Sequence, residues 1–242
     1  MVTLKLKFLK ALYNFYDEYA QNFSSVCTPG CATCCTHNVL ITTLEGVHIL
    51  FYLENRGKLR LLEKLHSTNY LRPRVTPNQL AHYCIHKIEP PEDDSFIISP
   101  CPFLTNGKCP IYEVRPFNCR SLFSEKKCHL GGEAFIHPLL LTVNMIFTQL
   151  LEQLDNSGLY GNMLDVLSFL ANEENLAVYM KGKTPNHTPG LLPNKPLPGF
   201  LCPPEHQLEV EKILEEISQI EIEKTKFTQY FKKLNSLKAN NV

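Results

Sequence analysis

The amino-acid sequence predicts a mainly α-helical protein with irregular cysteine-rich metal-binding segments and at most a few short strands. Two observations indicate this fold class. Apolar residues recur at helical spacing over several segments, and eight of the ten cysteines fall into two blocks separated by a proline-rich stretch. With 242 residues, of which 44% are hydrophobic and 20% charged, the chain has the composition of a folded globular protein.

Two amphipathic helices are expected around the first cysteine block. Apolar residues at helical spacing predict the first helix over Leu4–Phe23. After the block, Thr42 and Glu45 have the spacing of a capping box, in which each side chain bonds the backbone N–H of the other residue at a helix start. They predict a second helix that ends near Gly57.

The proline-rich stretch between the two blocks leaves room for little regular structure. Its apolar runs Tyr83–Ile88 and Phe96–Ile98 predict at most two short strands. Further on, the dipeptide Asn106–Gly107 predicts a tight turn between Cys101 and Cys109, which brings these two thiols near each other.

Helical spacing returns after the second block, over Pro138–Leu154 and again over Tyr160–Leu170. Seven of the 17 prolines fall in Thr184–Pro204, which predicts an extended strap or linker. The tail Glu205–Leu237 predicts one long helix with an apolar face. This face either packs onto the body, which we favour, or pairs with a second copy in a homodimer.

These patterns predict three parts of the chain. Residues 1–183 are expected to form a cysteine-cluster metal-binding domain with bracing helices. Residues 184–204 form the proline-rich strap or linker, and residues 205–242 form the C-terminal amphipathic helix.

Charge and cysteine usage predict the compartment. Twenty-four basic and 24 acidic residues cancel, so no charge excess favours nucleic acid or an anionic membrane as a partner. The sequence shows neither a signal-peptide pattern nor an apolar run long enough to span a membrane. We therefore expect a cytoplasmic protein, in which ten reduced cysteines favour metal ligation over disulfides.

Both cysteine blocks have the density of metal-ligand clusters. The eight candidate ligands are Cys27, Cys31, Cys34 and Cys35 in the first block, and Cys101, Cys109, Cys119 and Cys128 in the second. Eight thiols are enough for two four-ligand sites. In extended backbone, the adjacent Cys34 and Cys35 point to opposite sides, so they would serve different centres or one would be spare. Cys84 and Cys202 lie outside the blocks and are expected not to bind metal.

Iron–sulfur, iron and zinc all suit these thiols. Structural zinc sites are usually built from two Cys-x-x-Cys knuckles, and this chain has one, Cys31–Cys34. Iron–sulfur clusters accept a close trio of cysteines with a distant fourth ligand. The spacing therefore favours an iron–sulfur cluster or iron, with zinc as the alternative.

Two arginines and two histidines lie close to the candidate ligands. Arg115 and Arg120 flank Cys119 and would offset thiolate charge by donating N–H bonds to sulfur. Two alternatives stay open: Arg115 or Arg120 grips a carboxylate of a substrate or cofactor, or forms a surface ion pair with Glu113 or Glu125. His37 and His129 adjoin the blocks and are alternative ligands if a cysteine is spare.

The two blocks, together with Arg115-Pro-x-x-Cys119-Arg120, resemble the zinc- or iron-chelating cysteine-cluster domain family, which is named for its Cys-x-x-Cys-x-x-Cys-Cys motif. The flagellin lysine N-methylases are similar to that family. The resemblance covers about 100 residues and implies that the eight cysteines bind zinc or iron. For the methylase relatives it also implies an iron–sulfur cluster and methyl transfer to protein lysines. One departure is that three residues, not two, separate Cys27 from Cys31.

The same cysteines also resemble a second family. Cys27-x-x-x-Cys31-x-x-Cys34 has the spacing of the radical S-adenosylmethionine cluster loop. That fold needs alternating strands and helices after the loop, and this sequence predicts helices separated by coil.

We therefore expect a metal-binding protein with an iron–sulfur cluster or iron centre. That centre would take part in chemistry on a protein or small-molecule substrate, such as methyl transfer. The alternative is a non-enzymatic protein, in which structural zinc stabilises a loop-rich region and the C-terminal helix binds a partner.

Overall fold

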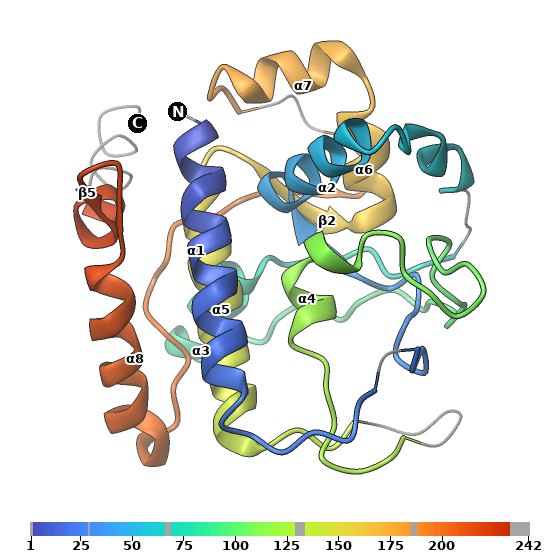
Figure 1. Ribbon diagram of the computed structural model, residues 1–242. Coiled ribbons are helices and arrows are strands. Elements are labelled where there is room, and N and C mark those ends of the chain that lie inside the picture. Colours follow the sequence, from blue (N-terminus) through green and yellow to red (C-terminus); the bar gives the residue numbers. More distant parts are fainter. Residues whose placement is uncertain (1, 29, 66–68, 129–133, 185–187, 233–242) are drawn as a thin grey trace.

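The structure is a computed structural model that describes residues 2–28, 30–65, 69–128, 134–184 and 188–232 (Figure 1). Helices dominate the described part of the chain, and its strands are short and form two small sheets. The prediction of a mainly α-helical protein with at most a few short strands is therefore confirmed.

The elements have the following bounds. The α-helices are α1 (Val2–Ala20), α2 (Thr43–Asn55), α3 (Pro77–His86), α4 (Phe117–Arg120), α5 (Pro138–Leu154), α6 (Met163–Leu170), α7 (Glu173–Met180) and α8 (Gln207–Gln219). The strands are β1 (Leu40–Thr42), β2 (Leu159–Asn162), β3 (Leu191–Pro193), β4 (Glu221–Ile222) and β5 (Thr225–Lys226). The short 3₁₀ helices are η1 (Leu59–Lys64), η2 (Tyr112–Val114) and η3 (Pro204–His206).

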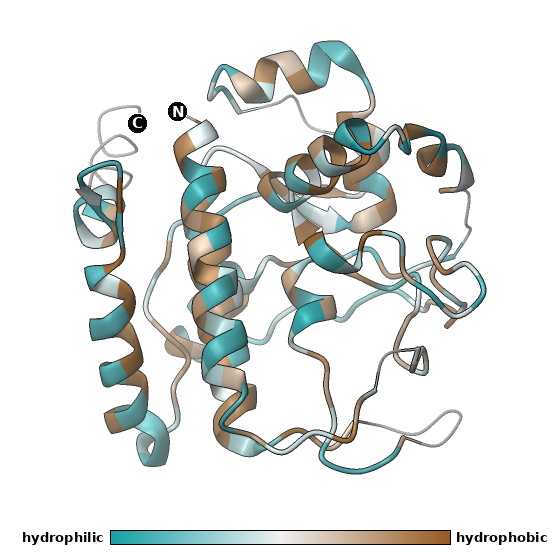
Figure 2. Cartoon of the chain, viewed as in Figure 1, coloured by the Kyte–Doolittle hydropathy of each residue, from teal (hydrophilic) through white to brown (hydrophobic). Residues whose placement is uncertain are grey.

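Helices α1 and α5 lie side by side at the centre of the molecule, with α8 along the flank of α1 (Figure 1). The apolar stripe of α1 faces inward: Phe8, Leu12 and Tyr16 are fully buried. The ring of Tyr16 meets that of Phe147 on α5 edge to face, with 5.2 Å between ring centroids. Figure 2 shows the amphipathic character of α1 and α8, in which hydrophobic and hydrophilic residues alternate along each helix. The apolar residues that recur at helical spacing in the sequence are therefore the ones that form the core.

The three-stranded sheet connects the helices that lie beside the cysteine segments. Its order is β1-β2-β3, with both pairs antiparallel. Strand β1 leads directly into α2, and β2 leads directly into α6, which packs on α2. A Cβ atom at Gly161 in β2 would lie 2.5 Å from a side-chain carbon of Leu191 and 2.9 Å from the carbonyl oxygen of Gly190. Only glycine allows this close pairing of β2 with β3.

The proline-rich stretch, for which at most two short strands were expected, contains neither of them in the described structure. Tyr83–Ile88 falls largely within α3, whose start is defined by Thr76 and Pro77. The Thr76 side chain accepts a hydrogen bond from the backbone N–H of Gln79, and Pro77 occupies the first turn, where its missing N–H costs nothing. Phe96–Ile98 runs as irregular backbone. The strand prediction overlooked these helix-start signals.

The predicted strap also contains regular structure. Residues Leu191–Pro193 form β3, which pairs with β2 so that Leu192 lies opposite Tyr160. Because β3 is an edge strand, Pro193 at its end breaks no interior ladder hydrogen bond. Pro185 lies outside the described residues.

The long C-terminal helix is interrupted. Helix α8 ends at Gln219, and β4 and β5 form a hairpin whose two turn residues, Glu223 and Lys224, have φ values of 50° and 64°. The chain is helical again over residues 227–232. A two-residue turn with positive φ at both positions matches strand twist and cannot continue a helix. The prediction of one helix over Glu205–Leu237 is therefore wrong, and its last residues lie outside the described part.

The apolar face of the tail packs on α1 within the same chain. Val210, Ile213 and Ile217 are buried. The ring of Phe227 lies 5.5 Å from that of Phe8 on α1, centroid to centroid. This is the packing that we favoured over homodimerisation. In the described part of the chain, no helix combines the length and the apolar character needed to cross a membrane.

Candidate metal centre

Seven of the eight predicted ligand cysteines line one cavity of about 240 Å³. They are Cys27, Cys31, Cys34, Cys35, Cys101, Cys109 and Cys119. The two blocks therefore meet in space, and we call this space the thiol cavity. Cys128 is half-buried and does not belong to its lining, and neither do Cys84 and Cys202. All ten cysteines are free thiols.

Backbone hydrogen bonds join the two blocks at both ends of the first one. The N–H of Cys101 donates to the carbonyl oxygen of Cys35 at 3.0 Å. At the other end, the N–H of Val26 donates to the carbonyl oxygen of Ser124 at 2.9 Å. The N–H of Ser124 in turn donates to the sulfur of Cys27 at 3.3 Å. Because main-chain atoms carry most of this pairing, it holds the blocks together independently of their side chains.

The first block turns sharply. The N–H of Cys31 donates to Thr28 and that of Cys35 to Ala32, each at 3.0 Å, as in successive turns. Cys34 and Cys35 consequently both face the thiol cavity, and the expectation that they point to opposite sides, which assumed extended backbone, is wrong. The Cys34 thiol donates a hydrogen bond to the Cys35 sulfur, which raises the pKa of Cys34 and lowers the pKa of Cys35.

The predicted turn in the second block is confirmed. Asn106 and Gly107 have φ values of 50° and 72°. Thr105 and Lys108 exchange two backbone hydrogen bonds of 2.9 Å across the turn. This is a two-residue hairpin loop, and it returns the chain so that Cys101 and Cys109 line the same cavity.

Helix α4 carries the third thiol of the second block. Phe117 anchors this helix in the core, with its ring centroid 4.8 Å from that of Tyr16 and 5.5 Å from that of Phe147. The side-chain amide of Asn118 donates to the carbonyl oxygen of Leu40 on β1 at 2.6 Å. With these two side chains fixed, Cys119 lines the cavity.

Glu45 is a supporting residue whose second role the sequence did not reveal. It forms the predicted capping box, in which its Oε2 accepts from the N–H of Thr42 at 2.9 Å, and that prediction is confirmed. Its Oε1 accepts from the N–H of Phe117 at 2.8 Å and from the hydroxyl of Tyr13 at 2.7 Å. The buried carboxylate thus ties α1 and α2 to the start of the helix that bears Cys119. Burial raises the pKa of Glu45.

The two predicted arginines differ in environment, although both line the thiol cavity. Arg120 is 6% exposed, forms an ion pair with Asp17, and has its guanidinium carbon 4.4 Å from the ring centroid of Tyr13. Arg115 is half-buried, and its guanidinium lies 4.2 Å from the ring centroid of Tyr112, which is 59% exposed. Neither arginine pairs with Glu113 or Glu125 in the described ion pairs.

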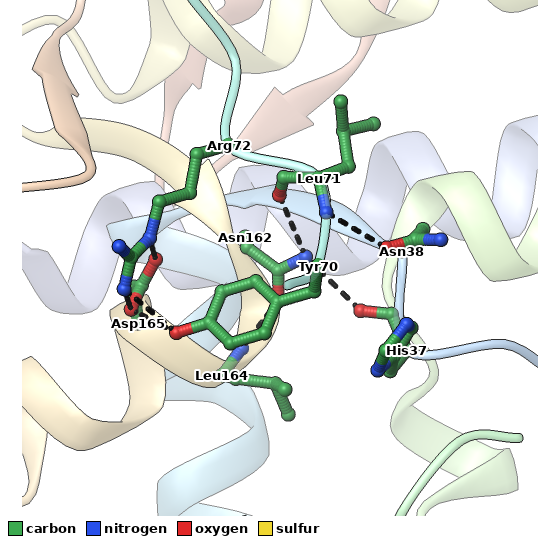
Figure 3. Close-up of polar contacts among 8 residues, drawn as sticks. All are labelled: His37, Asn38, Tyr70, Leu71, Arg72, Asn162, Leu164 and Asp165. Atoms are coloured by element: carbon green, nitrogen blue, oxygen red, sulfur yellow. Dashed lines mark hydrogen bonds and ion pairs between the residues drawn. The ribbon is translucent and has the colours of Figure 1, made fainter. Parts of the chain in front are cut away.

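The residues that follow the first block are held by Asn162, at the end of β2, and by the segment before α3 (Figure 3). The side-chain oxygen of Asn38 accepts from the N–H of Leu71 at 2.8 Å. The side-chain amide of Asn162 donates to the carbonyl oxygens of His37 and Leu71, both at 3.0 Å. His37 is buried, with Nε2 at 3.0 Å from the carbonyl oxygen of Ile97, and it does not line the cavity. His129 lies outside the described residues.

An ion pair between Arg72 and Asp165 fixes the segment before α3 to α6 (Figure 3). Arg72 donates from Nε and Nη2 to the two carboxylate oxygens of Asp165, at 2.9 and 3.1 Å. The Tyr70 hydroxyl donates to the same carboxylate at 2.5 Å, and burial raises the pKa of Tyr70. Bidentate geometry with a third donor makes this pair more rigid than an ordinary surface contact.

Sulfur is the dominant donor type on the cavity wall. Its described lining includes seven thiols and the guanidinium groups of Arg115 and Arg120, and no carboxylate or imidazole. Burial raises the pKa of Cys101, Cys109 and Cys119, and for Cys119 the neighbouring thiols raise it further. These thiols are therefore protonated unless a cation replaces their protons.

The thiols surround a cavity and do not converge on one point. Within the described residues, no three His, Cys, Asp or Glu side chains are grouped as the ligands of a metal ion. Comparison with protein-family models, curated proteins and solved structures finds no match to this chain.

Proposed function

We propose that this chain is a metal-binding protein whose cavity cysteines hold an iron–sulfur cluster or iron centre. One observation carries the proposal: two cysteine blocks far apart in the sequence bring seven thiols to one cavity. Buried cysteines that only fill a core would pack against apolar side chains. Here Cys101, Cys109 and Cys119 pack against the core on one side, but all seven thiols also line an open space, and Cys31 and Cys34 are exposed.

The donor set supports a soft metal. Thiolate ligands suit zinc, copper(I) and iron–sulfur clusters, whereas magnesium, calcium and manganese prefer carboxylates and carbonyls. The described lining offers sulfur and no carboxylate. Arg115 and Arg120 supply positive charge beside thiolates that would otherwise leave the centre negative.

The size of the space supports a cluster over a single ion. The cavity volume of about 240 Å³ is more than ten times the roughly 10–15 Å³ that a cavity needs to hold one water molecule. A structural zinc ion needs four sulfurs at about 2.3 Å, which leaves no such space between them. Iron–sulfur clusters are larger and bind four cysteines, so the seven cavity thiols include more than one cluster requires.

The chain's own residues would control this centre. Binding requires that Cys101, Cys109 and Cys119 lose their protons, so uptake of metal should release protons and weaken at low pH. When bound, an iron–sulfur cluster supplies electron transfer. The exposed side of the cavity at Cys31 and Cys34 is the route by which a protein or small-molecule substrate would approach.

The test is anaerobic reconstitution of cysteine variants with ferrous iron and sulfide. Cys31→Ser and Cys119→Ser, one from each block, should bind less iron and sulfide than wild type and show weaker visible absorption. Cys84→Ser and Cys202→Ser are matched controls, since neither thiol lines the cavity, and they should bind as much as wild type. Unchanged iron in both Cys31→Ser and Cys119→Ser would refute the ligand assignment. A colourless protein with stoichiometric zinc would favour the zinc alternative.

A further inference from the structure

Helix α3 presents two histidines to solvent, one turn apart. Its buried side includes Asn78 and Ala81, and the side-chain amide of Asn78 donates to the carbonyl oxygen of Gln149 on α5. His82 and His86 are both exposed, and their ring centroids lie 4.1 Å apart with 25° between the ring planes. Positions i and i+4 of a helix share one face. The backbone of a single helix therefore holds the two imidazoles next to each other.

A hydrogen bond to the backbone fixes the tautomer of His86. Its Nδ1 lies 2.8 Å from the carbonyl oxygen of His82. A carbonyl oxygen can only accept, so Nδ1 carries a proton, and in the neutral ring Nε2 has the free lone pair. Histidines that bind metals in proteins almost always donate their other ring N–H in this way, which orients the ring. His86 thus has the tautomer of a metal ligand.

The surroundings leave the pair available to a cation. Neither histidine belongs to a described ion pair. Both lie in the second half of α3, and the carbonyl end of a helix carries a partial negative charge that favours a cation. Lys87 follows the helix, but it is exposed, so water weakens its repulsion of a bound ion.

We propose that His82 and His86 together bind one divalent transition-metal ion. Imidazole suits zinc, copper and nickel ions, and two histidines four residues apart on one helix face bind zinc in the His-Glu-x-x-His motif. In the part of the chain that the structure describes, no third His, Cys, Asp or Glu completes the group, so water would fill the other positions. Neither histidine lines the thiol cavity, so this site is separate from the proposed iron–sulfur centre and does not rest on it.

The probe for this site is the Ni²⁺ complex of nitrilotriacetate, a chelator that covers most of the metal and leaves room for two imidazoles. Its binding is measured by isothermal titration calorimetry without oxygen, for wild type, His82→Gln, His86→Gln and His137→Asn. His137→Asn is the matched control. His137 is also exposed, its described ring contact is with Phe23, and its Nδ1 caps α5, a role that asparagine can keep.

Wild type should bind one complex per chain. Loss of either imidazole turns a two-point attachment into a single one, so His82→Gln and His86→Gln should each weaken binding about 100-fold. His137→Asn should bind as tightly as wild type.

Three results would overturn the inference. The first is that wild type does not bind the complex. The second is wild-type affinity in both His82→Gln and His86→Gln, because another group, such as an exposed thiol, would then hold the metal. The third is a loss in only one of these two variants, because a single imidazole would then account for the binding. The iron and sulfide content that tests the thiol cavity is measured separately, so the two proposals can fail independently.

Discussion

Replacing Glu45 with Gln should destabilise the metal-free protein strongly, because this carboxylate is the only described link that bonds α1, the start of α2 and the start of α4 at once. Its Oε2 accepts from both the N–H and the hydroxyl of Thr42, at 2.9 and 3.0 Å. Its Oε1 accepts from Tyr13 and Phe117. Glutamine keeps one oxygen and turns the other acceptor into an NH₂ donor, which would face two donors.

The magnitude follows from those four bonds. Two buried donors left without an acceptor cost about 1–3 kcal/mol each. Part of that loss is offset because the variant no longer buries a carboxylate, so we expect a net loss of about 2–4 kcal/mol in the free energy of unfolding. For a chain of 242 residues this lowers Tm by roughly 5–15 °C.

The assay is urea unfolding of the metal-free protein, followed by far-UV circular dichroism because the chain contains no tryptophan. Glu54→Gln is the matched control: Glu54 lies on the same helix and is exposed, so its change should stay within about 0.5 kcal/mol. A loss for Glu45→Gln that does not exceed that of Glu54→Gln would show that the Glu45 carboxylate does not stabilise the junction of α1, α2 and α4.

Three further outcomes are expected. Burial lowers the pKa of His48 from 6.5 to about 4, so the stability that this group contributes is present above pH 6.5 and is lost as the pH falls toward 4. Between pH 7 and pH 4.5, the free energy of unfolding measured in urea should fall by about 2 kcal/mol less in His48→Gln than in wild type. An equal fall in both proteins would contradict this. Asp165→Asn should cost about 1–2 kcal/mol at pH 7, since it weakens the contacts with Arg72 and Tyr70, and a change of only a few tenths would show that this ion pair is an ordinary surface contact. Gly161→Ala should cost about 1–3 kcal/mol, because its Cβ would overlap the neighbouring strand; a wild-type Tm would show that β3 moves aside freely.

Signals that depend on neighbouring residues were read correctly from the sequence. The Thr42–Glu45 capping box starts α2, and Asn106–Gly107 forms a tight turn. Each is a local motif whose hydrogen bonds close within a few residues, so the chain around it suffices to specify it. The second role of Glu45 could not be found in this way, because its partner Phe117 lies on a distant segment.

The two errors in the predicted secondary structure also have causes in neighbouring residues of the sequence. In Tyr83–Ile88 an apolar run was interpreted as a strand, although Thr76 and Pro77 provide a helix start just before it. In the tail, one long apolar repeat concealed a hairpin, whose only sequence sign was Lys224 within the repeat.

The meeting of the two cysteine blocks was anticipated from the sequence, whereas metal binding by these cysteines stays a prediction. Spacing alone selected the eight cysteines, and the structure brings seven of them to one cavity. Spacing could not show that Cys128 lies apart from that lining, because nothing local fixes where a segment of irregular backbone ends. It also could not show the burial of Arg120, which depends on Asp17 and Tyr13 of the distant helix α1.

The most direct test of the metal centre is the iron, zinc and acid-labile sulfide content of the wild-type chain purified without oxygen. We expect a coloured protein that contains iron and inorganic sulfide in similar amounts, with more than one iron per chain, as iron–sulfur clusters have. A colourless, folded chain without metal or sulfide, even after incubation with ferrous iron and sulfide, would contradict it.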